Sequence, residues 1–229
     1  KEKSKGELTV KVFPAAQLGQ EREAFEQLNR GILDMTLTSC GLMDKFWPPM
    51  GLMDLPFIWR DWDHVLNALN GEFGEALING LMAASNTRIV GLLGGGFRDL
   101  MFRGEPVRTA AKLKGMKMRS PEAYVWIRMY ELLGAKPTPI TWGEVYTAMQ
   151  TGVADGLDSP ALAALDMKFQ EVTKSMVRTQ HMHTVQGICI NKNRFAKLPS
   201  GLQKVVLAAG REAGNWASNY NKENGMKAY

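Results

Sequence analysis

The stretch GMKMRSPEAYVWIRMYELLGA, residues 115–135, joins a short extended run to a strongly marked helix. MKMR predicts a brief strand that ends at Arg119. After it, Ser120 offers an N-cap hydroxyl, Pro121 suits the first helical turn and Glu122 favours the positive end of the helix dipole. In open α/β sheets, ligands bind outside the carboxyl ends of the strands. The junction therefore predicts that Arg119 lies at a ligand-binding edge.

Strand-like and helix-like segments alternate on both sides of this junction. ELTVKVF (7–13) and ILDMTLTS (32–39) have the alternation of strands, and they flank a helix that is expected to stop at Gly31. NTRIVGLLGGG (86–96) predicts a buried strand that runs into a glycine cluster. Alternation of this kind is typical of α/β architecture, and we expect a largely parallel sheet.

The second half of the chain continues the pattern. TWGE (141–144) is a capping-box sequence that predicts another helix start. SMVRTQHMH (175–183) and TVQGICIN (184–191) predict consecutive β segments. A last helix is expected from Ser200 to about residue 224, although two glycines weaken its middle.

Composition excludes several classes of protein. The 229 residues are 45% apolar, which is ample for a packed core, and no uninterrupted apolar stretch is long enough to span a membrane. The net charge of +5 comes from interspersed residues, so we expect no nucleic-acid partner. Cys40 and Cys189 both stand among apolar residues, which predicts small buried side chains and no disulfide.

Two arginines carry the functional prediction. Arg98 follows an apolar strand and the GGG cluster, as Arg119 follows MKMR, and a planar guanidinium can hold a carboxylate through two parallel hydrogen bonds. From its position alone, Arg119 could equally form a structural ion pair with a nearby Asp or Glu. GLLGGGFRD lacks both the Lys-Ser/Thr ending of a phosphate loop and the G-x-G-x-x-G register, so the glycines do not indicate a nucleotide.

Several longer segments resemble one known family. GMKMR, LGAKPTPITWGEVYTAMQTGVADGLDSP, TQHMH and FPAAQLGQEREAFEQLNRGILDM are similar to the DctP-type solute-binding proteins of TRAP transporters, and the similarity spans nearly the whole chain. The resemblance implies a periplasmic α/β protein of two lobes that closes on an organic acid by a hinge motion. It implies transfer of that acid to the TRAP membrane permease, with no catalysis, cofactor or metal.

The resemblance also implies roles for particular residues. Arg119 matches the main carboxylate clamp of the family, Arg98 an arginine that lines the same cavity, and Trp142 an aromatic wall. Sialic-acid binders of the family have Asn and Glu where this chain has Ser159 and Ser39, which argues against sialic acid. The full predicted ligand-binding set is Arg119, Arg98, Trp142, Ser159, Asp158, Ser39, Phe97 and Glu122.

The resemblance sets the expected architecture as well. It implies a two-lobed periplasmic-binding-protein-like fold with strands that cross the hinge and a long C-terminal helix. Lobe I is expected to comprise residues 1–96 and 184–229, and lobe II residues 97–183. Members of the family normally begin with a further strand and helix and continue past Tyr229, so the chain is expected to be truncated at both ends. We expect a monomer.

Other functions have weaker support in the sequence. His181 and His183 in HMH would point to one face of a strand, but no third metal ligand stands nearby. An α/β enzyme that acts on an anionic metabolite is the alternative, since the same arginines could position a substrate, but no nucleophile elbow is present. The short side chains of Ser39 and Ser159 favour an aromatic, short aliphatic or 2-oxo acid over a heavily hydroxylated sugar acid.

Overall fold

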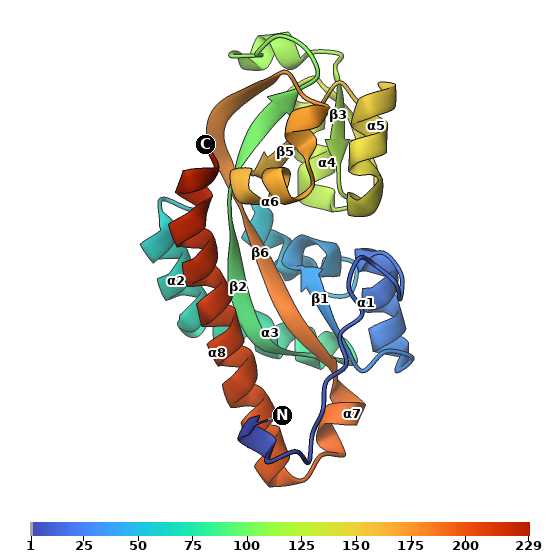
Figure 1. Cartoon of the computed structure of the whole chain (residues 1–229), viewed down its shortest axis with the longest axis vertical. Coiled ribbons are helices and arrows are strands. Elements are labelled where there is room, and N and C mark those ends of the chain that lie inside the picture. The colour runs from blue at the N-terminus through green and yellow to red at the C-terminus, as the bar shows by residue number, and fades with distance from the viewer. Residues whose placement is uncertain (1) are drawn as a thin grey trace.

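The computed structural model describes residues 2–229, which form two lobes stacked along the long axis of the molecule (Figure 1). The α-helices are α1 (Glu21–Arg30), α2 (Trp62–Asn70), α3 (Glu72–Ala84), α4 (Tyr124–Leu132), α5 (Val145–Thr151), α6 (Ala161–Asp166), α7 (Lys192–Ala196) and α8 (Ser200–Gly225). The strands are β1 (Met35–Ser39), β2 (Thr87–Phe102), β3 (Lys117–Ser120), β4 (Lys136–Pro139), β5 (Gly156–Pro160) and β6 (Ser175–Asn191). Short 3₁₀ helices include η2 (Cys40–Met43), η3 (Pro48–Asp54) and η5 (Trp142–Glu144).

A single sheet runs through both lobes in the order β1-β6-β2-β5-β3-β4. The expectation of a largely parallel sheet is wrong, because β6 pairs antiparallel with β1 and β2, and β2 pairs antiparallel with β5. Among the described strands, the parallel pairs are β3 with β4 and β3 with β5. The reason is the path of the chain: it passes from the first lobe to the second along β2 and returns along β6, so the two strands run in opposite directions.

The two long strands are the connection between the lobes. The sequence predicted β6 as two segments and, within β2, a strand that ends at residue 96, whereas β2 and β6 are each continuous and pair with one another along most of their length (Figure 1). Their register shifts between Gly94 and Gly96 and again between Arg98 and Leu100. Gly96 has a φ of 120°, which side chains other than glycine rarely allow. The ladder is thus irregular where it passes from one lobe to the other.

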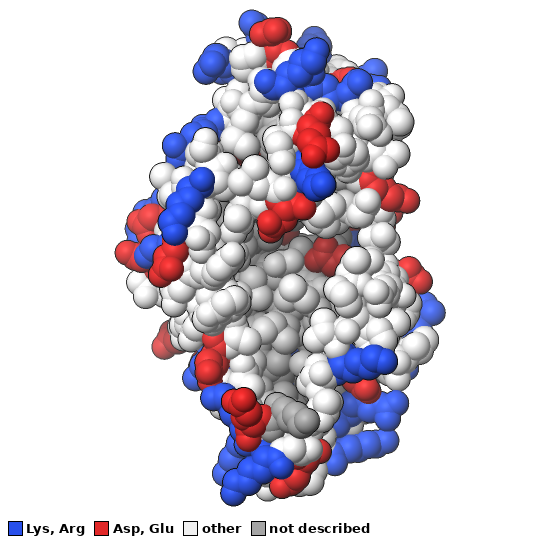
Figure 2. Space-filling model, in the orientation of Figure 1, with Lys and Arg blue, Asp and Glu red and all other residues white. Residues whose placement is uncertain are grey.

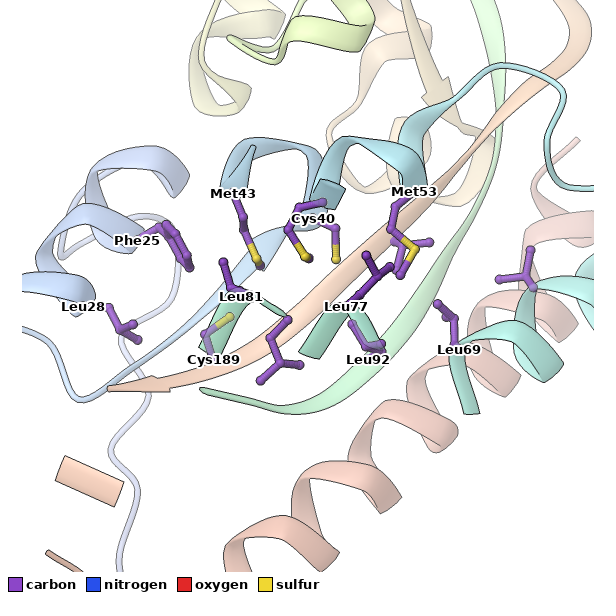
Figure 3. Close-up of a cluster of buried hydrophobic side chains, with 14 of the residues drawn as sticks. Phe25, Leu28, Cys40, Met43, Met53, Leu69, Leu77, Leu81, Leu92 and Cys189 are labelled. Carbon is purple, nitrogen blue, oxygen red and sulfur yellow. The ribbon is translucent and has the colours of Figure 1, made fainter. Parts of the chain in front are cut away.

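Each lobe has its own apolar core. The largest cluster lies in the lower lobe of Figure 1 and includes Phe25, Met43, Leu81 and Leu92 (Figure 3). Two clusters in the upper lobe are built from residues such as Phe102 and from α4 and α5. Cys40 and Cys189 are both buried in the lower cluster and both are free thiols, as predicted.

Helix α8 lies along β2 and spans much of the length of the molecule (Figure 1). Its predicted extent is confirmed, and its two central glycines have a packing reason. A Cβ at Gly210 would lie 2.5 Å from the carbonyl oxygen of Val90, and one at Gly214 would lie 2.3 Å from that of Leu92. Glycine therefore lets the helix backbone approach the strand backbone directly. Among residues 2–229, none of the helices combines the length and apolar character needed to cross a membrane.

Two local predictions are wrong. Residues 7–13 form no strand, and Val10 and Val12 are 59% and 77% exposed, because the alternating segment has no neighbouring strand among the described residues to complete its hydrogen bonds. Helix α4 begins at Tyr124, three residues later than Pro121, because β3 continues through Ser120. The hydroxyl of Ser120 therefore caps no helix and has no hydrogen-bond partner in the part of the chain that the structure describes.

Candidate functional site

Arg119 lies near the end of β3, in the upper lobe, and Figure 2 shows that the surface is hollowed between the two lobes. Only 3% of the residue is exposed. Its Nε and Nη2 both donate to the carbonyl oxygen of Ile140, at 3.0 and 2.7 Å, and its guanidinium carbon lies 5.4 Å from the ring centroid of Trp142. The predicted clamp and the predicted aromatic wall are therefore in contact.

No carboxylate of residues 2–229 forms an ion pair with Arg119, and its Nη1 has no hydrogen bond to them. Burial and the nearby positive charge of Arg98 lower the pKa of Arg119 to about 10. A buried cation without an anionic partner is costly, and an anionic ligand would remove that cost. Of the two explanations that the sequence left open for Arg119, the structural ion pair is absent from the described chain.

Arg98, unlike Arg119, has an acidic partner in the described chain. Its Nε donates to Oδ2 of Asp158, its Nη2 to the carbonyl oxygen of the same residue and its Nη1 to the hydroxyl of Thr184 at 2.9 Å. Its guanidinium also lies 5.3 Å from the ring centroid of Trp126. All three guanidinium nitrogens thus donate hydrogen bonds within the protein. Arg98 is therefore mainly a structural residue, at the place where β2 passes from one lobe to the other.

Asp158 is the centre of this buried network. Its Oδ1 accepts a hydrogen bond from the Tyr130 hydroxyl at 2.9 Å, and its Oδ2 accepts one from Trp126 Nε1 at 3.2 Å as well as the bond from Arg98. Burial alone would raise the pKa of Asp158, but Arg98, His181 and these hydrogen bonds lower it to about 2. The carboxylate is ionised, and it holds the Arg98 guanidinium in one orientation.

The remaining predicted residues have protein partners of their own. The Ser159 hydroxyl is buried and donates to the carbonyl oxygen of Pro160 at 3.0 Å. The backbone N–H of Ser39 donates to the carboxylate of Glu21. Phe97 and Glu122 face different parts of the molecule.

Phe97 packs against the lower core, where its ring centroid lies 4.8 Å from that of His183 and 6.4 Å from that of Trp62. Glu122 lies at the rim between the lobes, with its Oε2 3.4 Å from Nε of Arg22 on α1. The structure therefore joins Arg119 with Trp142 and Arg98 with Asp158, while Phe97 and Glu122 make other contacts.

Asp54 is a buried acid outside the predicted ligand-binding set. Its side chain is 1% exposed, and neither carboxylate oxygen has a hydrogen-bond donor among residues 2–229. Burial and neighbouring acids raise the pKa of Asp54 well above its usual range, against the opposing effect of Arg98. It stands beside Gly41, where a Cβ would lie 2.8 Å from the Asp54 carboxyl carbon. Its only signal in the sequence is its place before the Leu-Pro of DLPFIW.

His181 and His183 take structural positions in the fold. Nδ1 of His181 lies 2.8 Å from the Thr179 hydroxyl, and its Nε2 lies 3.8 Å from Oδ2 of Asp158. Burial lowers the pKa of His183 to about 3, so this ring is neutral between its aromatic neighbours. In the described chain, no three His, Cys, Asp or Glu side chains come together in a group that could hold a metal ion.

A two-lobed α/β molecule joined by crossing strands, with a buried arginine that has no anionic partner, is the architecture of a solute-binding protein. The family model described as "Bacterial extracellular solute-binding protein, family 7", called DctP, matches residues 1–229. The chain belongs to this family. Membership confirms the resemblance seen in the sequence and decides against the enzyme alternative, because the family consists of solute-binding proteins.

Relatives and solved structures agree with this assignment. A solute-binding protein of Sulfitobacter sp., NAS141_03721, is 37% identical over 99% of this chain and 69% of its own length. The 2,3-diketo-L-gulonate-binding periplasmic protein YiaO of Escherichia coli is 30% identical over the same shares of both chains. The crystal structure of a Sulfitobacter TRAP periplasmic solute-binding protein with bound β-D-galacturonate matches with a TM-score of 0.94 and 30% identity, over 99% of this chain and 75% of that one.

A second structure has a different ligand. The TRAP periplasmic solute-binding protein of Desulfovibrio salexigens, with bound orotic acid, matches with a TM-score of 0.93 and 27% identity over 99% of this chain and 73% of that one. The expected two-lobed fold with crossing strands and a long C-terminal helix is thereby confirmed.

Proposed function

We propose that this chain captures a small organic carboxylate between its lobes and that Arg119 is the clamp for the carboxylate. The observation that carries the proposal is the buried guanidinium of Arg119, which lies against Trp142 and has no ion-pair partner in the described chain. Arg98, whose charge is balanced by Asp158, would line the same cavity. Ser159 and Ser39 would border the ligand.

The two lobes in this proposal are residues 1–96 with 184–229, and residues 97–183. The core clusters support this division, since the largest one draws on Phe25 to Leu92 and on Val185 and Cys189. The upper clusters draw mainly on residues between Leu100 and Met182. Hinge closure over the ligand would occur where the paired strands β2 and β6 pass between the lobes.

Sugar acids are the ligand class that we propose to test first. Similar proteins have been crystallised with β-D-galacturonate, β-D-glucuronate and L-galactonate, each of which has a carboxylate and several hydroxyls. This proposal differs from the preference for an aromatic or short acid that the serines suggested. Orotic acid, which is bound to the Desulfovibrio protein, represents that other class.

We also propose where the protein works. Its relatives include periplasmic binding proteins, which supports a periplasmic location and delivery of the acid to a TRAP membrane permease. A monomer suffices for this role, because the two lobes of one chain enclose the ligand.

Calorimetric titration of Arg119 variants tests the proposal. The probes are D-galacturonate, D-glucuronate, L-galactonate and orotate, and the tightest binder is then used throughout. Arg119→Lys keeps the charge but loses the two-point geometry, so the affinity should fall roughly tenfold to hundredfold, and Arg119→Ala should lose more. Arg128→Ala, which removes an exposed arginine of α4, is the matched control and should bind like the wild type. Unchanged affinity in Arg119→Ala would falsify the clamp.

A further inference from the structure

The three-residue connection from β3 to α4, residues 121–123, is held from the opposite lobe. It begins two residues after Arg119, so its position constrains the end of the strand that directs the arginine. Two side chains of the lower lobe hold it: Arg22, from the first turn of α1, bonds Glu122 within it, and Asp44, after η2, bonds Tyr124 at its end. Both belong to segments whose neighbours, Phe25 and Met43, are buried in the lower core.

Asp44 supplies a helix cap across the lobe boundary. The N-cap residue of α4, Ala123, has no side chain that can accept a hydrogen bond. Oδ2 of Asp44 instead accepts the backbone N–H of Tyr124, the first residue of α4, at 3.0 Å. An unpaired N–H in the first turn is a real cost, and a carboxylate also interacts favourably with the positive end of the helix. The lower lobe thus provides the hydrogen-bond acceptor that Ala123 lacks.

Arg22 holds the other side of the same connection. Its Nη2 donates to the carbonyl oxygen of Glu122, and its Nε lies 3.4 Å from the Glu122 carboxylate. The Arg22 side chain is only 14% exposed, so this contact is more shielded from solvent than an ordinary surface pair. The backbones of Glu122 and Tyr124 are therefore both hydrogen-bonded to side chains of the lower lobe.

We propose that Asp44 and Arg22 are positioning residues of the carboxylate site. By fixing the connection that follows Arg119, they hold its guanidinium where a ligand can meet it, and they do so only while the two lobes face each other. The inference rests on the proposed function of Arg119. It predicts that the lower lobe contributes to affinity through residues that touch no ligand.

The first test compares two helix caps. Asp61 caps α2 by accepting the His64 N–H at 2.7 Å, and this contact lies entirely within the lower lobe. Asp44→Ala should weaken binding of the tightest probe of the carboxylate panel about twofold to thirtyfold, the range for a lost N-cap. Asp61→Ala should leave the affinity unchanged. Asp44→Asn keeps an acceptor oxygen at the same place and should restore most of the affinity.

The second test is a double-mutant cycle on the pair across the rim. Arg22→Ala and Glu122→Ala should each weaken binding roughly twofold to tenfold, and the double variant should be no weaker than the worse single one. The matched control is the exposed pair Arg128–Glu131 within α4, whose removal should not change the affinity. Glu122→Ala keeps the backbone carbonyl oxygen that accepts from Arg22, so a smaller loss there agrees with the positioning role. Wild-type affinity in Arg22→Ala would overturn that role.

Hydrogen exchange gives a readout that needs no ligand. The amide of Tyr124 should exchange faster in Asp44→Ala than in the wild type or in Asp61→Ala, since it loses its acceptor. Equal effects of Asp44→Ala and Asp61→Ala on affinity, or none from either, would refute the inference even if Arg119→Ala abolishes binding. If Arg119→Ala binds the ligand normally, the proposed role of Arg119 is wrong. The exchange data still report whether Asp44 caps α4.

Discussion

At the scale of single residues, Asp158 should make the stability of the protein depend on pH. Its pKa in the folded protein is about 2, below the value of about 3.9 for an unperturbed Asp, so its stabilising effect is fully present above pH 4. It should be lost as the pH falls towards 2, by about 2 kcal/mol. Urea unfolding of the wild type between pH 2 and pH 7 measures this slope.

The variant Asp158→Asn isolates the contribution of this residue. It leaves Arg98 buried beside a neutral side chain, so we expect the free energy of unfolding at pH 7 to fall by about 3 to 5 kcal/mol. The acid dependence between pH 4 and pH 2 should flatten. Asp63→Asn, which removes an exposed partner of Lys222, serves as the control and should change neither quantity by more than about 0.5 kcal/mol. An unaltered acid slope in Asp158→Asn would contradict the assignment.

At the scale of elements, the contact of α8 with β2 depends on its glycines. Gly214→Ala would place a methyl group 2.3 Å from the carbonyl oxygen of Leu92, so the helix must move away from the strand. We expect a loss of about 1 to 3 kcal/mol of stability, measured by urea unfolding, although alanine is the better helix former. Gly201→Ala, at an open position of the same helix, should be neutral or stabilising by up to about 1 kcal/mol. Equal effects at both positions would show that close packing is not what the glycine provides.

At the scale of the whole molecule, ligand binding should bring the lobes together. The lobes are joined by β2 and β6, whose ladder is irregular around Gly94 to Gly96, and Arg119 lies near the boundary between them. We expect small-angle scattering to show a smaller radius of gyration when the wild type is saturated with the tightest carboxylate of the panel. Arg119→Ala at the same ligand concentration should stay at the unliganded value. A radius that does not change on saturation of the wild type would rule out hinge closure.

Much of the molecule was predictable because its signals are local. The apolar face of α1 with Gly31 after it, the extent of α8 and the short strand ending near Arg119 depend on residues close together in the sequence. The segments that resemble DctP proteins identified the family, and the structure brings two residues named by that resemblance, Arg119 and Trp142, into contact. Residues 7–13 show the limit of such signals, since an alternating pattern forms a strand only where another strand lies beside it.

Only the tertiary structure decided which acidic side chains pair with which arginines. In the sequence, Arg98 and Arg119 look alike, since each follows an apolar strand. In the folded protein Asp158 arrives on β5 beside Arg98, while no carboxylate of the described chain pairs with Arg119. Likewise, the cap of α4 comes from Asp44, which is 80 residues away. These pairings depend on the antiparallel return of β6 and on the apposition of two lobes. Local sequence determines elements, but contacts between distant elements determine which buried charge remains available for a ligand.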